Sequence, residues 1–273
     1  KDGSVDLLGK VSADGETGGT VNVRANNLLV DGVVSASATK DAGRVSMVTT
    51  GTTIETTNGV VQATSKTGRG GRIYVDGGEN TFTSGVLRAN GGLGGHVSVL
   101  GDEVTLAAAR IRADGVNGGG RVRVGGGFKG GEDLHASVRT RVNESTSINA
   151  DAQARGNGGD VVVWSDGTTQ FAGNILARGG AANGNGGRVE VSGRTGLGFN
   201  GEVDVTARNG DVGSLLLDPR NIRFTSEELP AQPTKLLDPH PGADNFFGSN
   251  VQYFDANGNP VFSESGAATI VVL

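Results

Sequence analysis

Short runs in which apolar and polar residues alternate recur along most of the chain, separated by polar turns rich in glycine. One unit covers residues 11–23, V-S-A-D-G-E-T-G-G-T-V-N-V, and close copies begin at Leu87 and Ile111. Further copies begin at Ile148 and Ile175. Alternation with a period of two is typical of β-strands and not of helices. The pattern therefore predicts pairs of short strands, repeated along the chain.

The spacing of these units is nearly constant. The last glycine before each second strand marks a unit, and successive markers lie 24, 28, 24, 25, 39, 28 and 26 residues apart. The markers are Gly19, Gly43, Gly71, Gly95, Gly120, Gly159, Gly187 and Gly213. A third apolar position precedes each unit's first strand, as Leu29 precedes Val33 and Phe171 precedes Ile175. Three short strands in a unit of this length predict an all-β fold, a parallel β-helix of about eight rungs.

Equivalent positions in the units carry similar side chains. An aliphatic residue opens the first strand of each unit, and alanine follows two residues later. The alanines are Ala13, Ala36, Ala63, Ala89, Ala113, Ala150, Ala177 and Ala207. In the last unit this alignment makes Val205 the opening residue. Both inward positions of the second strand are apolar in all units, and stacked side chains of this size fill a thin core at native density.

One long step indicates an insertion between Val124 and Ile148. Residues 138–142 still read as the third strand of the unit, so the extra residues are mainly 126–137. A loop that leaves a solenoid is a common place for function. The alternative is a surface loop that the fold merely tolerates.

The composition changes after Leu217. All six prolines and five of the nine phenylalanines lie beyond it, and proline cannot donate to a sheet ladder. We therefore expect the β-helix to cover residues 1–217 and a separate C-terminal extension to cover 218–273. Residues 218–235 are expected to cap the open end of the helix, which otherwise exposes unpaired backbone groups. Strands at residues 250–254 and 259–262 are expected to form a hairpin.

Composition narrows the function classes. Glycine contributes 49 residues and aromatic residues only 4%, which favours a narrow core over a wide one. The absence of cysteine excludes disulfides and thiol chemistry. A net charge of −5 gives no support for nucleic acid as a partner, and no apolar run is long enough to span a membrane. The first residue lies next to a repeat, so the natural chain is expected to be longer.

Residues 156–180, G-N-G-G-D-V-V-V-W-S-D-G-T-T-Q-F-A-G-N-I-L-A-R-G-G, followed by G-G-R-V-E-V-S-G and L-L-L-D-P-R-N-I, resemble the two-partner-secretion exoproteins of Gram-negative bacteria. These are the filamentous-haemagglutinin-like adhesins. The resemblance implies a right-handed parallel β-helix that is exported through an outer-membrane transporter partner. That partner acts on an N-terminal secretion domain, which this sequence lacks. The segment D-P-H-P-G-A-D-N-F-F-G-S-N-V resembles the first of the FG-containing repeats that follow the helix in some such proteins.

A stripe of basic residues is the main candidate binding site. Most of its residues follow or nearly follow the marker glycines, on the outward face of the second strand: Arg44, Arg72, His96, Arg121, Arg123 and Arg188. Arg88 and Arg112 stack on neighbouring rungs of the first strand. Side chains at a fixed spacing suit an anionic polysaccharide or a cell-surface glycan. The alternative is that these arginines only keep an exposed sheet soluble.

Other candidates carry less chemistry. Trp164 has the side chain for stacking on a sugar, but an indole at this place also commonly packs over a rung corner. The turn residues after each alanine are ordinary turn formers, and the calcium-repeat signature is not in register. Asp160, Asp166 and Glu190 lie on adjacent rungs without a catalytic motif. His96, His135 and His240 show no metal-ligand spacing. We therefore assign no catalytic residue, metal or cofactor.

These observations, with the resemblance, predict a non-enzymatic adhesive segment of a secreted surface protein of a Gram-negative bacterium. Its outer face would contact host or biofilm surfaces, with a matrix polysaccharide, a cell-surface glycan or a host receptor as partner. Two alternatives stay open. One is a polysaccharide lyase or hydrolase on the same fold, and the other is a spacer stalk with no ligand.

Overall fold

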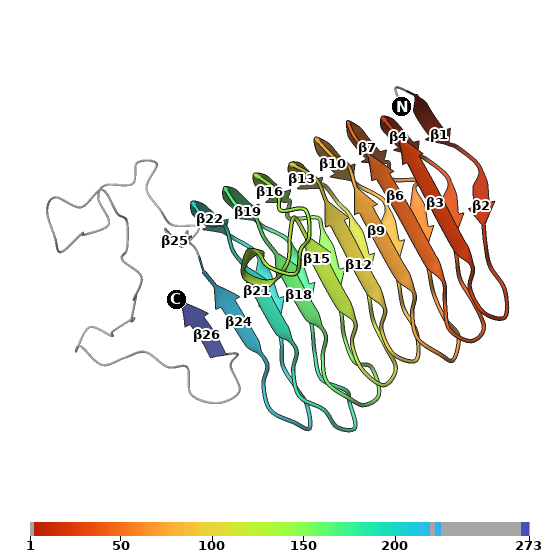
Figure 1. The fold of residues 1–273 in the computed structure, drawn as a ribbon. Coiled ribbons are helices and arrows are strands. Elements are labelled where there is room, and N and C mark those ends of the chain that lie inside the picture. Colours follow the sequence, from red (N-terminus) through yellow and green to blue (C-terminus); the bar gives the residue numbers. More distant parts are fainter. Residues whose placement is uncertain (1–2, 219–221, 225–268, 273) are drawn as a thin grey trace, which may run out of the picture.

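A computed structural model of the chain describes residues 3–218, 222–224 and 269–272. Apart from one turn of 3-10 helix, η1 (Phe128–Gly130), the regular structure described is β-strand, arranged in three parallel sheets. The sheets are the three sides of one solenoid, which runs from the N-terminal rung to the last strands (Figure 1). The predicted parallel β-helix is confirmed.

Each rung contributes one strand to each sheet, and eight rungs are complete. Sheet I consists of β1 (Ser4–Leu7), β4 (Asn27–Val30), β7 (Thr52–Glu55), β10 (Asn80–Thr83), β13 (Glu103–Leu106), β16 (Arg139–Val142), β19 (Thr168–Phe171), β22 (Gly196–Phe199) and β25 (Ile222–Phe224). Sheet II consists of β2 (Lys10–Ser12), β5 (Val33–Ser35), β8 (Val60–Gln62), β11 (Val86–Arg88), β14 (Arg110–Arg112), β17 (Ser147–Asn149), β20 (Asn174–Leu176) and β23 (Glu202–Asp204). Sheet III consists of β3 (Thr20–Ala25), β6 (Arg44–Thr49), β9 (Arg72–Asp76), β12 (His96–Leu100), β15 (Arg121–Val124), β18 (Asp160–Val163), β21 (Arg188–Val191), β24 (Ser214–Leu217) and β26 (Thr269–Val272).

The core is a narrow apolar column enclosed by the three sheets. In sheet III the second and fourth residues of each strand point inward, so that Val122 and Val124 are both fully buried. The alanines after sheet II are buried in the middle rungs: Ala36, Ala63, Ala89, Ala113, Ala150 and Ala177. Side chains at equivalent positions of successive rungs stack on one another, because neighbouring strands pair without a shift of register. The predicted columns are thus confirmed in these rungs.

A tight arc joins sheet II to sheet III in each rung. The N–H of Gly159 donates to the Ala150 carbonyl at 2.7 Å, and the N–H of Asp160 donates to Gly120 of the previous rung at 2.9 Å. A methyl group added to Gly159 would lie 2.6 Å from the Ala150 Cβ and still closer to the Gly120 carbonyl oxygen. Glycine is required here by the close approach of backbones.

The predicted column is wrong in the eighth rung. Val203 pairs with Ile175, and Gly213 donates to the Val205 carbonyl at 2.8 Å. Val205, which is fully buried, therefore takes the alanine position, and Ala207 lies two residues further along the arc. Among the described residues, β23 is the last strand of sheet II, so the alanine column ends one rung earlier, at Ala177.

The third apolar position is also shifted by one residue in the second rung. Leu28 and Val30 are the buried residues of β4, whereas Leu29 pairs with the exposed Ile54 on the outer face of sheet I. The run of consecutive apolar residues in this strand contains no alternation, so it does not show which of them point inward.

The corner between sheets III and I is polar inside. Buried hydroxyl groups from the second residue of several sheet I strands bond to the chain at the end of sheet III. The Thr81 hydroxyl donates to the Leu100 carbonyl at 2.6 Å, and the Thr140 hydroxyl donates to the Trp164 carbonyl at 2.7 Å. The hydroxyl groups thus find acceptors inside the corner, and the Leu100 carbonyl accepts the N–H of Gly77 as well, at 3.0 Å.

One carboxyl group lies inside the core. Glu55 is fully buried, and neither of its carboxyl oxygens has a hydrogen-bond partner among the described residues. It faces Thr83 of the next rung, whose hydroxyl is also without a hydrogen bond. Burial raises the pKa of Glu55 to about 8, and the nearby Thr83 hydroxyl offsets this only in part. At neutral pH the carboxyl group is therefore mostly protonated.

The C-terminal end is covered by strands added in parallel to two sheets. β25 pairs with β22 in sheet I, and β26 pairs with β24 in sheet III. The ladder thus continues past Leu217, where the sequence predicted it to stop. Most of the predicted cap, residues 218–235, and the predicted hairpin at residues 250–254 and 259–262 lie outside the described residues.

Gly159→Ala tests the rung contact. The added methyl group has to displace the backbone of the neighbouring rung, so we expect a loss of about 1–3 kcal/mol in the free energy of unfolding. Gly198→Ala is the matched control, because its Cβ would lie 4.0 Å from its nearest neighbour, Gln170. Urea unfolding followed by circular dichroism measures both, and equal midpoints would contradict the packing described here.

Glu55→Gln tests the buried carboxyl group. Its pKa is 4.5 ordinarily and about 8 in the folded chain, so the folded state holds a proton that the unfolded state releases between these values. The wild type is then expected to lose roughly 5 kcal/mol of stability relative to the variant as the pH rises from about 4.5 to above 8. Urea midpoints at pH 5 and 9 measure this. Glu144→Gln, at an exposed carboxylate, should show no such divergence from the wild type.

Candidate functional site

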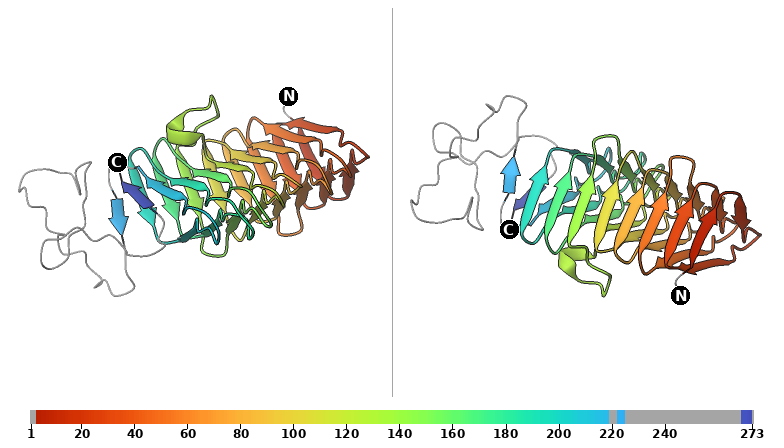
Figure 2. Two further views of the ribbon diagram at one scale, coloured as in Figure 1. Left: turned by 90° about the horizontal axis from the view of Figure 1, so that it is seen from below. Right: turned by 90° about the horizontal axis from the view of Figure 1, so that it is seen from above.

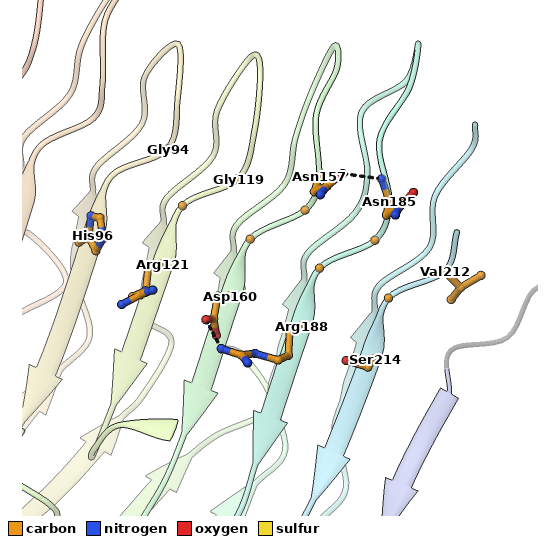
Figure 3. A pocket seen from close by; sticks show the side chains of 16 residues that line it. Gly94, His96, Gly119, Arg121, Asn157, Asp160, Asn185, Arg188, Val212 and Ser214 are labelled. Carbon is orange, nitrogen blue, oxygen red and sulfur yellow. Dashed lines mark hydrogen bonds and ion pairs between the residues drawn. The ribbon is translucent and has the colours of Figure 1, made fainter. Parts of the chain in front are cut away.

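A groove of about 740 Å³ runs along the edge of sheet III where its strands begin. It crosses five rungs, from β12 to β24. The polar side chains that line it are His96, Arg121, Asn157, Asp160, Asn185, Arg188 and Ser214 (Figure 3). Its long axis follows the solenoid, so the lining groups recur once per rung.

The groove exists because glycines form its floor. Pairs such as Gly119 with Gly120 and Gly158 with Gly159 precede the strands of sheet III and carry no side chains. The first residue of each strand points outward beside them, while the second is buried. Backbone amides and outward polar side chains therefore lie together, an arrangement that suits a ligand with many hydroxyl or carboxylate groups.

A column of cations extends the groove toward the N-terminal rungs. Arg44 pairs in register with Arg72, Arg72 with His96, and His96 with Arg121. All four are exposed, and no carboxylate of the described chain lies within 4.0 Å of the three arginines. Partial burial, with Arg72 and Arg121 on either side, lowers the pKa of His96. The three arginines are thus free cations on this face.

The C-terminal part of the predicted stripe is neutralised. Asp160 accepts from Arg188 at 2.6 Å and from Arg123 at 3.2 Å. Burial alone would raise the pKa of Asp160, but Arg188 and Arg123 outweigh it and lower the pKa. Arg123 is only 1% exposed and also pairs with Glu132 at 2.7 Å. It lies on the predicted face but under the inserted segment, so it is not part of an exposed stripe.

Arg88 and Arg112 lie on the outer face of sheet II, in register on adjacent rungs. Arg110 belongs to the same cluster, since it alternates with Arg112 on β14 and pairs with Val86. Arg110 was not among the predicted residues, although the R-I-R alternation at residues 110–112 places both arginines on one face. No described carboxylate lies within 4.0 Å of any of the three.

Trp164 follows β18 on the outward side but is only 4% exposed. Its indole N–H donates to Asp166 at 3.0 Å, and its ring packs against glycines of the inserted segment. It therefore packs within the protein, one of the two possibilities that the sequence left open, and it is not presented to solvent.

The acidic residues considered for catalysis are each engaged. Asp160 binds Arg188, and Asp166 lies 3.3 Å from Arg194. Glu190 is fully buried beneath the inserted segment. Of the three, only Asp160 lines the groove, whereas glycoside hydrolysis uses a pair of carboxyl groups that flank the scissile bond.

The turn residues after the alanine column bind the backbone of the next rung. Asp114 accepts from the N–H of Asp151 at 3.1 Å, and Asp151 accepts from the N–H of Arg178 at 2.7 Å. These bonds account for the polar column as turn chemistry. Among the residues that the structure describes, no group of His, Asp or Glu side chains is arranged to hold a metal ion.

Comparison with protein-family models and with curated proteins found no match. In the part of the chain that the structure describes, no helix has the length and apolar character needed to cross a membrane. The observations that bear on function are therefore the groove, the cationic column and the motifs of the sequence.

The two described histidines should titrate in opposite directions from the ordinary pKa of about 6.5. We expect His96 to titrate below it, for the reasons given above. Burial lowers the pKa of His135 as well, but hydrogen bonds to Asp102 and Asp76 outweigh this and raise it. Imidazole NMR signals measured against pH in a His240→Asn background separate the two. Arg72→Ser should raise the midpoint of His96 alone, and a midpoint that stays unchanged would contradict the cationic column.

Proposed function

We propose that this segment is an adhesive module of a secreted bacterial surface protein, and that it binds an extended acidic polysaccharide along sheet III. The observation that carries the proposal is the polar groove across five rungs, continued by the column of free arginines at Arg44, Arg72 and Arg121. Both features follow the axis of the solenoid.

An extended polymer suits this geometry better than a compact ligand. Neighbouring rungs lie about 4.8 Å apart, a rise similar to the length of one sugar residue. A stretched polysaccharide could thus place successive residues over successive rungs. Asn157 and Asn185 provide amide groups at the groove, where sugar hydroxyls can both donate and accept.

Charge favours an acidic polymer. Guanidinium groups bind carboxylates and sulfates through charge-assisted hydrogen bonds. The chain as a whole carries a net charge of −5, so a local cationic column is a specific feature and does not reflect overall composition. The resemblance to two-partner-secretion adhesins supports the assignment to a cell surface and to export through an outer-membrane partner.

Binding of polygalacturonate, a polymer of uronic acid, tests the proposal, with neutral dextran as the reference polymer. In the double variant Arg72→Ser/Arg121→Ser we expect affinity for polygalacturonate to fall about tenfold, because two charge-assisted contacts are lost. The loss should shrink between about 50 and about 300 mM salt. The double variant Arg139→Ser/Arg141→Ser, an equal change of charge on the outer face of sheet I, is the matched control.

The same experiment distinguishes the alternatives. Appearance of shorter products during incubation would replace the adhesive assignment by a polysaccharide lyase or hydrolase. Absence of binding to a panel of acidic and neutral polysaccharides would leave a spacer. Binding that the double variant and the control reduce equally would overturn the location on sheet III.

A further inference from the structure

The inserted segment, residues 126–137, folds back over the outer face of sheet III. Figure 1 shows it in front of the sheet, and Figure 2 shows the same segment standing off the body of the solenoid. Several of its residues have positive φ angles, including Lys129 at 52°, Glu132 at 68° and Asp133 at 48°. Residues other than glycine rarely adopt this conformation. Such a backbone persists only where surrounding contacts hold it.

The segment covers side chains that would otherwise be exposed. Four residues that alternate with inward valines lie on the outer face of the sheet: Arg123, Val162, Trp164 and Glu190. All four are nevertheless less than 5% exposed. Val162 pairs in register with Glu190 and with Arg123. The covered patch is therefore contiguous across three rungs.

The indole of Trp164 is covered by backbone. A methyl group added to Gly126 would lie 2.6 Å from the indole Cδ1, and one added to Gly130 would lie 2.8 Å from Cζ2. Glycine at both places lets the segment lie against the ring. An indole face is also an apolar surface on which the C–H groups of a sugar ring can stack.

Glu190 is incompletely bonded beneath the same segment. Its Oε2 accepts from the backbone N–H of Lys129 at 3.0 Å, and its Oε1 has no partner among the described residues. Burial raises the pKa of this carboxyl group, although the Lys129 N–H and the nearby Ser192 hydroxyl partly offset the effect. A buried polar atom without a partner costs free energy that a hydroxyl group of a ligand would recover.

Besides the Lys129–Glu190 hydrogen bond, ionisable side chains hold the segment down at two places. Glu132 forms a bidentate pair with Arg123, with both distances at 2.7 Å. At the other end, His135 lies between Asp76 and Asp102, at 2.8 and 2.9 Å from its two ring nitrogens. A third contact is aromatic, since the guanidinium of Arg188 lies 4.3 Å from the centre of the Phe128 ring.

We propose that residues 126–137 are a lid over a second sugar subsite, formed by Trp164, Glu190 and Arg123. This inference rests on the proposed polysaccharide binding and extends it. The subsite is continuous with the groove, because Asp160 and Arg188 line the groove and contact Arg123 and Phe128 respectively. When the lid opens, the indole offers a stacking face, and the carboxylate and guanidinium offer hydrogen bonds to sugar hydroxyls.

The His135 contact makes the lid sensitive to pH. Both ring nitrogens face carboxylates, and only the protonated imidazole can donate to both. The Tyr74 hydroxyl donates to Asp76, and burial and Asp76 raise its pKa to about 12, although the charge of Arg44 partly offsets this. Tyr74 stays neutral below that pH. The stabilisation by His135 is complete below its ordinary pKa of about 6.5 and is lost as the pH rises through its higher folded value.

Glu190 acts in the same direction. Its carboxyl group is covered in the closed state, so loss of its proton at higher pH disfavours closure. The charged groups near it are Lys129 of the lid and Asp218. The pKa of Glu132 is lowered and that of Arg123 is raised by their pairing, so the pair opposes opening to the same extent at low and at high pH. Raising the pH therefore shifts the population toward the open lid without releasing the segment entirely.

Trp164 reports the lid directly, because it is the only tryptophan in the chain. Quenching of its fluorescence by acrylamide is expected to increase about twofold or more between pH 6 and pH 9 as the open population grows. His135→Asn should raise quenching at pH 6 and remove most of the pH dependence. His96→Asn, at the exposed histidine of the cationic column, is the matched control and should keep it. Quenching that is independent of pH in the wild type would overturn the lid.

The subsite is tested separately from the groove. Glu132→Gln weakens the anchor and is expected to strengthen binding of polygalacturonate at pH 6 by about threefold, since the competent state is then more populated. Trp164→Phe in the same background should reverse that gain. If Arg72→Ser/Arg121→Ser abolishes binding but Glu132→Gln leaves the wild-type affinity unchanged, the subsite is wrong while the groove stands. If no variant binds, the proposed function fails, and fluorescence quenching still decides whether the lid opens.

Discussion

Close stacking of one rung on the next is the constraint from which the rest of this structure follows. Strands of neighbouring rungs pair in register over three sheets, so each side chain lies directly above its equivalent. The arcs bring backbones so near that glycine is needed at Gly120 and Gly159, because any side chain would overlap the rung below. The interior is accordingly a narrow column of aliphatic side chains and alanine, with Ile73 and Met47 among the valines of sheet III, and it is packed closely enough that a change of volume at one level is felt at the next.

The same register organises the outer surface. Groups that follow the marker glycines are held at equal intervals, which converts single arginines such as Arg72 and Arg121 into an ordered array. The insertion does not disturb this order, because β16 resumes pairing with β13 immediately after it. A solenoid can therefore acquire a covering segment at one rung and keep a continuous binding surface along the others.

The fold was predictable from sequence because it repeats. Alternation identified the strands, and the glycine markers identified the rungs, including the interrupted one. The errors arose where repetition weakens: at the last rung, where Val205 replaces alanine, and in β4, where consecutive apolar residues hide the inward face. The site was harder to predict, because burial of Arg123 and Trp164 depends on contacts with an insertion that has no counterpart in other rungs. The burial of Glu55 was not predicted either, because a glutamate at an inward position does not follow the apolar pattern of the repeat.

The anchoring of the insertion also has a mechanical consequence. Hydrogen bonds between rungs run along the axis of the solenoid. A pulling force along that axis therefore acts directly on these bonds, and rungs can separate one after another. Segment 126–137 bridges several of these junctions through side chains, from Asp76 on β9 to Glu190 on β21. These contacts cross-link the middle rungs of the solenoid. Under tension, rungs at either end would separate before those that the segment cross-links. The rung that carries Arg44 would therefore separate at a lower force than the rungs around Trp164.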